Sequence, residues 1–380
     1  MNKLNCTIFR GGTSKGVFIL EKDLPSDTIQ WDAILLSIMG SPDKLQIDGL
    51  GGATSTTSKV AIISTSDNSD WDINYTFAQV SIDKAMVSYK GNCGNISSAV
   101  GPYAIEQGLV TVADGDETVV RIYNTNTKKI IYSHGKTENG QVNYNGDFAI
   151  AGVPGTSSVV KLAFQDPAGS MTGKLLPTGN VVDTLDVPKY GQIEVSLVDS
   201  SNPLVFVKAS DVGLTGIELP NDIDSDPELL EKLEAIRGVA AVKLGFCEDY
   251  TKSTEETPGV PKMTIVAEPT DYTSSKGELI KSEDMDILGR MMSMQLTHKS
   301  YALTGALCTA TAAGIEGTVV NKLVRKNSDG SYDPSTITIA HPSGLMQNGV
   351  EINIDGDQIN VPAAYGLNQN WKWFLKLGKI

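Results

Sequence analysis

Two helical segments rich in small residues constrain the fold of this 380-residue chain most strongly. They are predicted at about residues 95–107 and 305–314, where Ala, Gly, Ser and Thr dominate. A helix on the outside of a sheet typically has one apolar stripe and an opposite charged face. These two helices instead carry mainly small side chains, so each helix is narrow. We therefore expect each helix to lie inside a sheet that wraps around it.

Short strand-like segments, rich in β-branched and aromatic residues and separated by turn formers, surround both helices. They are expected at residues 5–10, 17–20, 59–64, 73–81, 86–89, 119–124, 129–133, 194–199, 204–208, 241–244, 263–267, 336–340 and 350–354. Amphipathic helices are predicted at residues 28–39, 227–237 and 283–297. The pattern predicts an α+β protein with two related domains, 1–183 and 184–358. Residues 359–380 are expected to pack back on the first domain.

The composition excludes several classes of partner. A net charge of −14 argues against nucleic acid, which favours a basic face. The chain has no run of about 18 apolar residues that would predict a membrane span, and no apolar segment typical of a secretory signal begins it. Its four cysteines are far apart, which is typical of reduced thiols in the cytoplasm. Nothing in the composition decides for or against a homo-oligomer.

Two glycine-rich segments in the first domain are candidate binding loops. The turn at residues 10–16 contains Ser14, and its backbone N–H groups could hold a carboxylate. The segment at residues 48–59 contains Gly51, Thr57 and Ser58 and ends on Lys59, which enters an apolar strand. If Lys59 is buried in a cleft, it becomes a candidate base, because burial favours the neutral amine. The alternatives are a tight hairpin with a basic tip and an ordinary surface lysine.

The first small-residue helix opens on Gly91, Asn92, Cys93, Gly94 and Asn95. A thiol at a helix N-terminus is favoured as the thiolate, and the free N–H groups there can bind carboxylates. The alternative is an inert cysteine that only packs. The Gly and Asn residues on both sides of the cysteine favour the functional interpretation, because they indicate a close approach of the backbone.

The histidines do not predict a metal site. His298 follows the predicted helix at 283–297, and a lone histidine is more often structural than catalytic. His134 and His341 lie at turns. None of the three has a carboxylate at a metal-ligand spacing, so we expect no metal. The chain also has no G-x-S-x-G motif, which leaves a serine hydrolase without support.

Taken together, these motifs resemble the methylaconitate and methylitaconate isomerase family, the PrpF-like proteins with a fold of the diaminopimelate-epimerase type. The resemblance spans nearly the whole chain in the expected order. The matching segments are 10–16, 47–52, 57–59, 75–82, 91–95, 178–180, 202–203, His298 and 305–309.

The resemblance implies two pseudo-symmetric domains, each a curled, mostly antiparallel sheet around a central helix, and an active site between the helix N-termini. It also implies catalysis without a cofactor. Lys59, Cys93 and His298 are the expected catalytic residues. The expected substrate-binding residues are Ser14, Gly51, Thr57, Ser58, Gly91, Asn92, Gly94, Asn95, Thr304, Gly305, Cys308 and Thr309.

The implied reaction moves a proton next to a carboxylate of a small unsaturated di- or tricarboxylic acid. The match resembles 3-methylitaconate isomerase most, which implies conversion to 2,3-dimethylmaleate. Alternatives within the family are 2-methylaconitate cis–trans isomerase, aconitate isomerase and oxalomesaconate tautomerase. An amino-acid racemase or epimerase would need Cys93 and Cys308 as a pair of thiols, but Cys308 lacks the flanking glycines of the epimerases. A non-catalytic binding protein is the remaining alternative.

Overall fold

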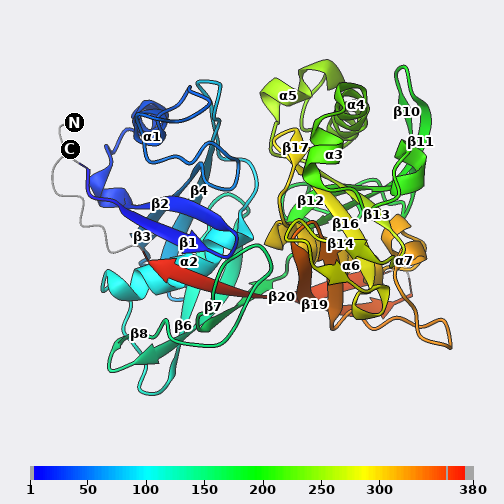
Figure 1. Cartoon of the computed structure of the whole chain (residues 1–380). Helices are drawn as coiled ribbons and strands as arrows, with labels where there is room; N and C mark the ends of the chain where they lie inside the picture. Colours follow the sequence, from blue (N-terminus) through cyan, green and yellow to red (C-terminus); the bar gives the residue numbers. More distant parts are fainter. Residues whose placement is uncertain (1–3, 357, 373–380) are drawn as a thin grey trace. The chain divides into compact units, whose positions relative to one another are not determined.

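The computed structural model describes residues 4–356 and 358–372 (Figure 1). Its backbone forms two compact units. Unit 1 comprises the described residues 4–163 and 367–372, and unit 2 comprises residues 164–366. Residues 373–380 of the predicted closing segment lie outside the described residues.

The unit boundaries differ from the predicted ones at both crossings. Residues 164–183 belong to unit 2 because the carboxylate of Asp199 accepts hydrogen bonds from the backbone N–H groups of Met171 and Thr172. The chain returns to unit 1 only after Gly366, because the last strand pairs within unit 2 as far as that residue.

The strands of unit 1 form a closed ring. Their bounds are β1 Thr7–Gly11, β2 Ser14–Leu20, β3 Lys59–Thr65, β4 Ile73–Val80, β5 Val87–Ser88, β6 Glu117–Asn124, β7 Lys129–Glu138, β8 Gln141–Val142, β9 Val159–Gln165 and β20 Gln358–Lys372. Around the ring, β1, β2, β3, β4, β6, β7, β9 and β20 pair in turn, and β20 pairs with β1. The short strands β5 and β8 extend the pairing at β4 and β7. Both β9 and β20 continue from one unit into the other.

The main sheet of unit 2 is an open curl. Its strands are β10 Asp183–Val187, β11 Gly191–Ser200, β12 Asn202–Lys208, β13 Lys262–Ala267, β16 Ile287–Ser293, β17 Leu296–Thr297, β18 Ile337–His341 and β19 Gly344–Asp355, with β20 following β19. A separate two-stranded sheet is made by β14 Tyr272–Thr273 and β15 Leu279–Ile280.

The two units repeat one topology. In unit 1 the successive pairs β1–β2, β2–β3, β3–β4, β4–β6 and β6–β7 alternate between antiparallel and parallel. The pairs β11–β12, β12–β13, β13–β16, β16–β18 and β18–β19 of unit 2 alternate in the same order. A predominantly antiparallel α+β fold with two pseudo-symmetric halves is therefore confirmed.

Each half encloses one central helix, as the small-residue pattern predicted. In unit 1, α2 (Gly94–Glu106) contacts β1, β2, β3, β6 and β7, and it is buried except at Glu106 (Figure 1). In unit 2, α6 (Leu303–Gly314) contacts β11, β12 and β19 and is buried except at Gly314. Small side chains are required because strands surround both helices.

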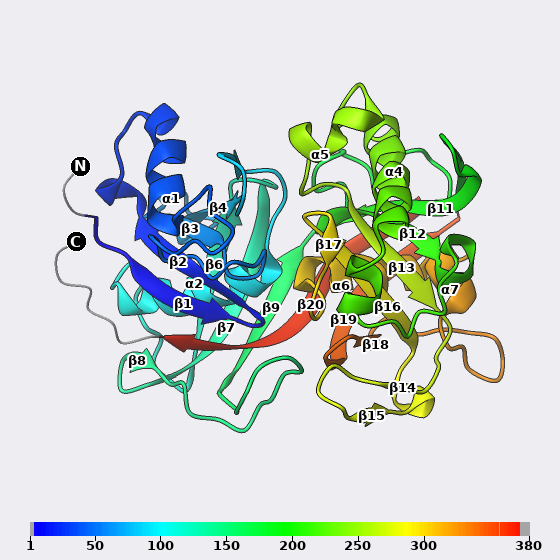
Figure 2. The ribbon, with the colours of Figure 1, turned by 45° about the horizontal axis from the view of Figure 1, so that its top comes forward.

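Amphipathic helices cover the other faces of the two sheets (Figure 2). In unit 1, α1 (Trp31–Met39) packs Leu35 and Met39 against β2, β3 and β4. In unit 2, α4 (Pro227–Lys243) packs Leu233 and Ile236 against β10 to β13. The short helices α3 (Pro220–Asp224), α5 (Ser253–Glu256) and α7 (Val319–Leu323) complete unit 2.

Two predictions of secondary structure are wrong. The expected helix at 283–297 is instead β16 and β17, because every residue of β16 is buried and a fully buried strand has no period that distinguishes it from a helix. The expected strand at 241–244 is the end of α4. Gly238 does not end that helix, because it provides room for the backbone of Tyr250.

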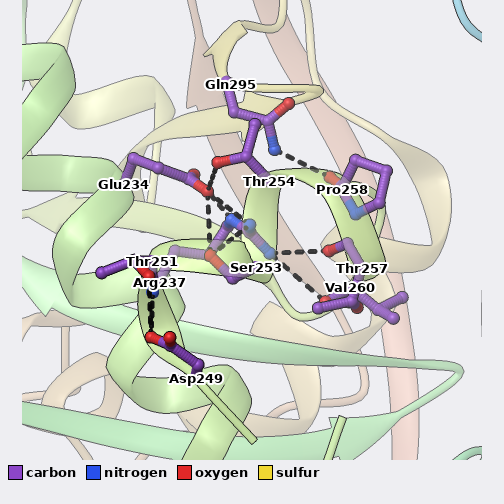
Figure 3. Close-up of polar contacts among 10 residues, drawn as sticks. All are labelled: Glu234, Arg237, Asp249, Thr251, Ser253, Thr254, Thr257, Pro258, Val260 and Gln295. Carbon is purple, nitrogen blue, oxygen red and sulfur yellow. Dashed lines mark hydrogen bonds and ion pairs between the residues drawn. The ribbon is translucent and has the colours of Figure 1, made fainter. Parts of the chain in front are cut away.

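A partly buried ion pair holds the segment that follows α4 (Figure 3). The guanidinium of Arg237 lies 2.5 Å from the carboxylate of Glu234 and donates to the carbonyl oxygens of Thr257 and Val260. It also donates to the hydroxyl of Ser253 in α5. Arg237 is only 3% exposed, whereas the Glu234 side chain is 23% exposed, so the guanidinium is buried and the carboxylate partly reaches water.

Candidate active site

Lys59 is the first residue of β3 and is buried, with 7% of its surface exposed. It pairs with Gly16 of β2 on one side and with Gln79 of β4 on the other. Its Nζ donates to Oε1 of Gln79 at 2.5 Å and lies 5.3 Å from the centre of the Phe77 ring. The structure therefore places Lys59 inside unit 1 and excludes the surface lysine that the strand pattern also allowed.

The surroundings of Lys59 favour its neutral form. Burial lowers the pKa of the Lys59 ammonium below its ordinary value, and the neighbouring Cys93 thiol acts in the opposite direction. Tyr75, on the same strand as Gln79, is fully buried. Burial, and secondarily Cys93, raise the pKa of Tyr75 well above its ordinary value, so its hydroxyl keeps its proton at neutral pH. Lys59, Cys93 and Tyr75 thus form a cluster of groups that can hold or transfer a proton.

Cys93 is the N-cap of α2 and is 9% exposed. Its thiol does not cap the helix. Instead, the Asn92 side chain accepts from the backbone N–H of Cys93 at 2.7 Å and from the hydroxyl of Ser97 at 3.1 Å. Gly91 turns the chain before the helix with a φ of +80°, a conformation that glycine adopts at no steric cost. The thiol is therefore left for Lys59 and for a ligand.

The turn between β1 and β2 lies against the start of α2. Gly12 has a φ of +54°, and a Cβ there would come within 2.5 Å of the side chain of Asn95, so glycine is favoured at this position. Asn95 donates to the hydroxyl of Thr13 and accepts from Asn368. The Ser14 hydroxyl on this turn is 1% exposed and has no hydrogen-bond partner among the described residues. Ser14 thus remains a candidate ligand donor.

Three other predicted binding residues have structural contacts. The Ser58 hydroxyl donates to the carbonyl of Val80 and accepts from Gln46. Gly51 leaves room for the Gln46 side chain, and Thr57 bonds with Thr54 in a turn. These contacts shape the loop that leads into Lys59, so Gly51, Thr57 and Ser58 help to place Lys59 rather than present free polar groups.

In unit 2, the predicted residues lie around the start of α6. His298 is 5% exposed, and its Nδ1 accepts from the backbone N–H of Ser300. Thr304 is fully buried, and its hydroxyl has no hydrogen-bond partner among the described residues. Gly305 leaves room for the side chain of Met291. Thr304 is therefore a candidate ligand donor in unit 2.

Cys308 does not lie at the start of α6. It is in the middle of α6, fully buried, and its Sγ donates to the carbonyl of Val198. Burial raises the pKa of this thiol, which disfavours a thiolate. The N-cap of α6, which corresponds to Cys93 in α2, is Ala302. The hydroxyl of Thr309 donates to the carbonyl of Gly305 within the helix. The second thiol of a two-thiol racemase is thus missing from the corresponding position.

Gln79 and Tyr75 were not among the predicted site residues. Gln79 stands in the apolar stretch from Phe77 to Val80, and a polar residue in a buried strand needs a partner. That signal could have marked Gln79. Tyr75 gave no signal, because a tyrosine in a strand is ordinary.

The described residues of unit 1 therefore bring a buried amine, a thiol and a phenol together, and each of these groups can hold or transfer a proton. Among residues 4–356 and 358–372, no group of three or more His, Cys, Asp and Glu side chains is arranged to hold a metal ion. In the same part of the chain, none of the helices has both the length and the apolar character needed to span a membrane.

Comparison with known proteins decides the family. The family model described as PrpF protein matches residues 1–364. The chain belongs to the PrpF family. It is 46% identical over 345 residues to the 3-methylitaconate isomerase of Eubacterium barkeri. The alignment covers 90% of this chain and 89% of that protein. It is 40% identical over 363 residues to the 2-methyl-aconitate isomerase of Shewanella oneidensis. This alignment covers 92% of this chain and 89% of that protein.

A solved structure gives the same result for the fold. The crystal structure of a methylitaconate-delta-isomerase matches 99% of this PrpF-family chain and 95% of its own, with 43% identity and a TM-score of 0.78. The prediction that the chain is an isomerase of this family is confirmed.

Proposed function

We propose that this chain moves a double bond in a small unsaturated dicarboxylic acid, with 3-methylitaconate and 2,3-dimethylmaleate as the substrate pair and without a cofactor. The observation that carries the mechanism is the buried Lys59 amine beside Cys93 at the start of α2. The relatives named above act on acids of this class, which supports the choice of substrate.

In the proposed reaction, neutral Lys59 removes the proton from the carbon that carries the methyl group next to a carboxylate. That C–H bond breaks, and its electron pair forms a dienolate that extends over the neighbouring double bond. A proton is then delivered to the terminal methylene carbon, either by Cys93, whose thiolate afterwards takes a proton back from the Lys59 ammonium, or by any one of the three protons of that ammonium. The products are a new methyl group and an internal double bond, so atoms and charge balance.

Neutral donors are proposed to hold the carboxylates of the substrate. The candidates are the first backbone N–H groups of α2 and the hydroxyl of Ser14, with the start of α6 and Thr304 acting in the same way in unit 2. Such donors suit a protein with a net charge of −14, because they bind an anion without a cluster of lysines. His298 is kept as the alternative proton carrier. We also propose a cytoplasmic location, because the four cysteines lie far apart in the sequence, a spacing typical of reduced thiols.

A panel of acids tests the function. The purified protein is incubated in EDTA-containing buffer with 3-methylitaconate, 2-methylaconitate, trans-aconitate, oxalomesaconate, and L-proline as a racemase control. We expect the highest kcat/KM for 3-methylitaconate and no racemisation of proline. Racemisation of proline, or activity that EDTA abolishes and a divalent metal restores, would contradict the proposal. A higher kcat/KM for 2-methylaconitate would reassign the substrate within the family.

Replacements at Cys93 separate the roles of its thiol. If Cys93 donates a proton but need not be a thiolate, we expect Cys93→Ser to retain measurable turnover and Cys93→Ala to lose more. The reason is that a hydroxyl can donate a proton, whereas a methyl group cannot. Steady-state kinetics on both variants, with Cys308→Ser as the matched control, measure the difference. Equal and complete loss in both Cys93 variants would instead show that the thiolate is essential.

A further inference from the structure

Gln79 lies directly opposite Lys59 in the antiparallel pair of β3 and β4. Side chains opposite each other in such a pair are on the same face of the sheet. Gln79 is 8% exposed, and its Oε1 accepts the hydrogen bond from Lys59 Nζ at 2.5 Å. The amide is therefore in direct contact with the proposed base.

The orientation of the Gln79 amide follows from its other contacts. Its Nε2 donates to the carbonyl oxygen of Ser58 at 2.9 Å and to that of Ser55 at 3.3 Å. Carbonyl oxygens only accept, so the NH₂ end of the amide must face these two residues. The oxygen end is left for Lys59. The same three bonds join the turn at residues 55–58 to the first residue of β3.

An amide oxygen is suited to hold a lysine that must give up its proton. It accepts one N–H of the amine whether Lys59 is charged or neutral, and it does not itself take the proton. A carboxylate in the same place would favour the ammonium through its charge. With one N–H directed to Gln79 and the Phe77 ring 5.3 Å away, the lone pair of the neutral amine is restricted to the remaining directions.

We propose that Gln79 is a positioning residue, which fixes the direction of the Lys59 amine and keeps a negative charge away from it. This role rests on the proposed function of Lys59 as the base. The titratable groups that face Lys59 within unit 1 are the Cys93 thiol at the start of α2 and, beside it, the Tyr75 hydroxyl on β4. On β2, Lys15 places its ammonium by Gly52 and Thr57.

Two replacements at Gln79 make opposite predictions. Gln79→Glu places a carboxylate beside Lys59, so the pH at which kcat rises should move upward by about 1–3 units. Gln79→Met keeps the volume but removes the acceptor. Its kcat should fall about 10-fold or more, because the orientation of the Lys59 amine is no longer fixed. The pH at which its kcat rises should not move upward. In both variants KM should stay unchanged, since Gln79 does not contact the substrate in this account.

A measurement without turnover separates this proposal from the proposed function. The protein is labelled with ¹³C at lysine Cε, the Lys59 signal is assigned by its loss in Lys59→Arg, and its titration is followed by NMR. We expect the Lys59 midpoint to rise in Gln79→Glu and not to rise in Gln79→Met. The exposed Gln192, replaced by Glu, is the matched control and should change nothing.

The outcomes are distinct. If wild-type protein turns over none of the acids, the proposed function fails, but the NMR titration still tests the contact between Gln79 and Lys59. If Gln79→Glu does not fold, Gln79→Met alone decides through its kcat and its Lys59 titration. A Gln79→Met variant with wild-type kcat, or one whose Lys59 midpoint rises, would overturn the positioning role. An unmoved midpoint in folded Gln79→Glu would overturn it as well.

Discussion

Replacing Lys59 by alanine or glutamine should lower kcat by a factor of about 10²–10⁴, the usual contribution of a general base. The physical reason is that Lys59 is buried beside Cys93, and burial lowers its pKa below the ordinary value. The neutral amine, which is the active form, is therefore populated at lower pH than in a free lysine. The rate should rise with pH as Lys59 loses its proton, and this rise should be absent in both variants.

Matched variants separate the base from simple binding. Lys59→Arg should not rescue activity, because a guanidinium stays protonated in proteins. Lys15→Ala, on the neighbouring strand β2, should mainly raise KM, because Lys15 is only partly buried and can contribute charge but not the proton transfer. Steady-state kinetics between pH 6 and 10 check both expectations. Near-normal turnover in Lys59→Ala would make His298 the better candidate for the base.

The second large effect is on stability. Arg237→Ala should lower the free energy of unfolding by about 3–5 kcal/mol, because it leaves the partly buried Glu234 carboxylate without its partner. The carbonyl oxygens of Thr257 and Val260 also lose the hydrogen bonds that Arg237 donates to them. Urea unfolding followed by circular dichroism measures the change, and Figure 3 shows the contacts that are lost.

The chain offers a control on the same helix. Glu231 of α4 pairs with Lys189, and both side chains are more than half exposed. Lys189→Ala should leave the unfolding curve unchanged within error, because exposed ion pairs contribute little. The double variant Arg237→Met with Glu234→Gln should recover part of the lost stability, since no unpaired charge remains. If Arg237→Ala behaves like Lys189→Ala, the ion pair does not hold the segment after α4.

Much of the fold could be predicted because the way in which a helix is buried leaves a pattern of residue size or polarity in the sequence. The small residues of α2 and α6 predicted central helices because strands surround both. The amphipathic α1 and α4 were predicted because each has one face in water. The helix predicted at residues 283–297 was wrong because β16 is buried on both faces, so its apolar residues show no period that marks a strand. The helix predicted at residues 227–237 was too short, because the glycine that follows it, Gly238, is required by a close contact with Tyr250 and does not end the helix.

The candidate site could be predicted where it depends on a few consecutive residues. Gly91 to Asn95 mark a helix start within five residues, and Lys59 follows a glycine-rich loop. Gln79 was out of reach, because its role depends on strand pairing that places it opposite Lys59. The place of Cys308 within its helix was out of reach for a similar reason, since only the helix bounds show that Ala302 occupies the N-cap of α6.

Proton NMR in deuterated water tests the central claim most directly. Wild-type protein and Lys59→Gln are each incubated with 3-methylitaconate, and deuterium uptake at the methylene carbon and at the carbon next to the carboxylate is followed over time. The account predicts that the wild type forms 2,3-dimethylmaleate with deuterium in its new methyl group, whereas Lys59→Gln takes up deuterium at least about 10² times more slowly. Deuterium uptake by Lys59→Gln at the wild-type rate would contradict the assignment of Lys59 as the base.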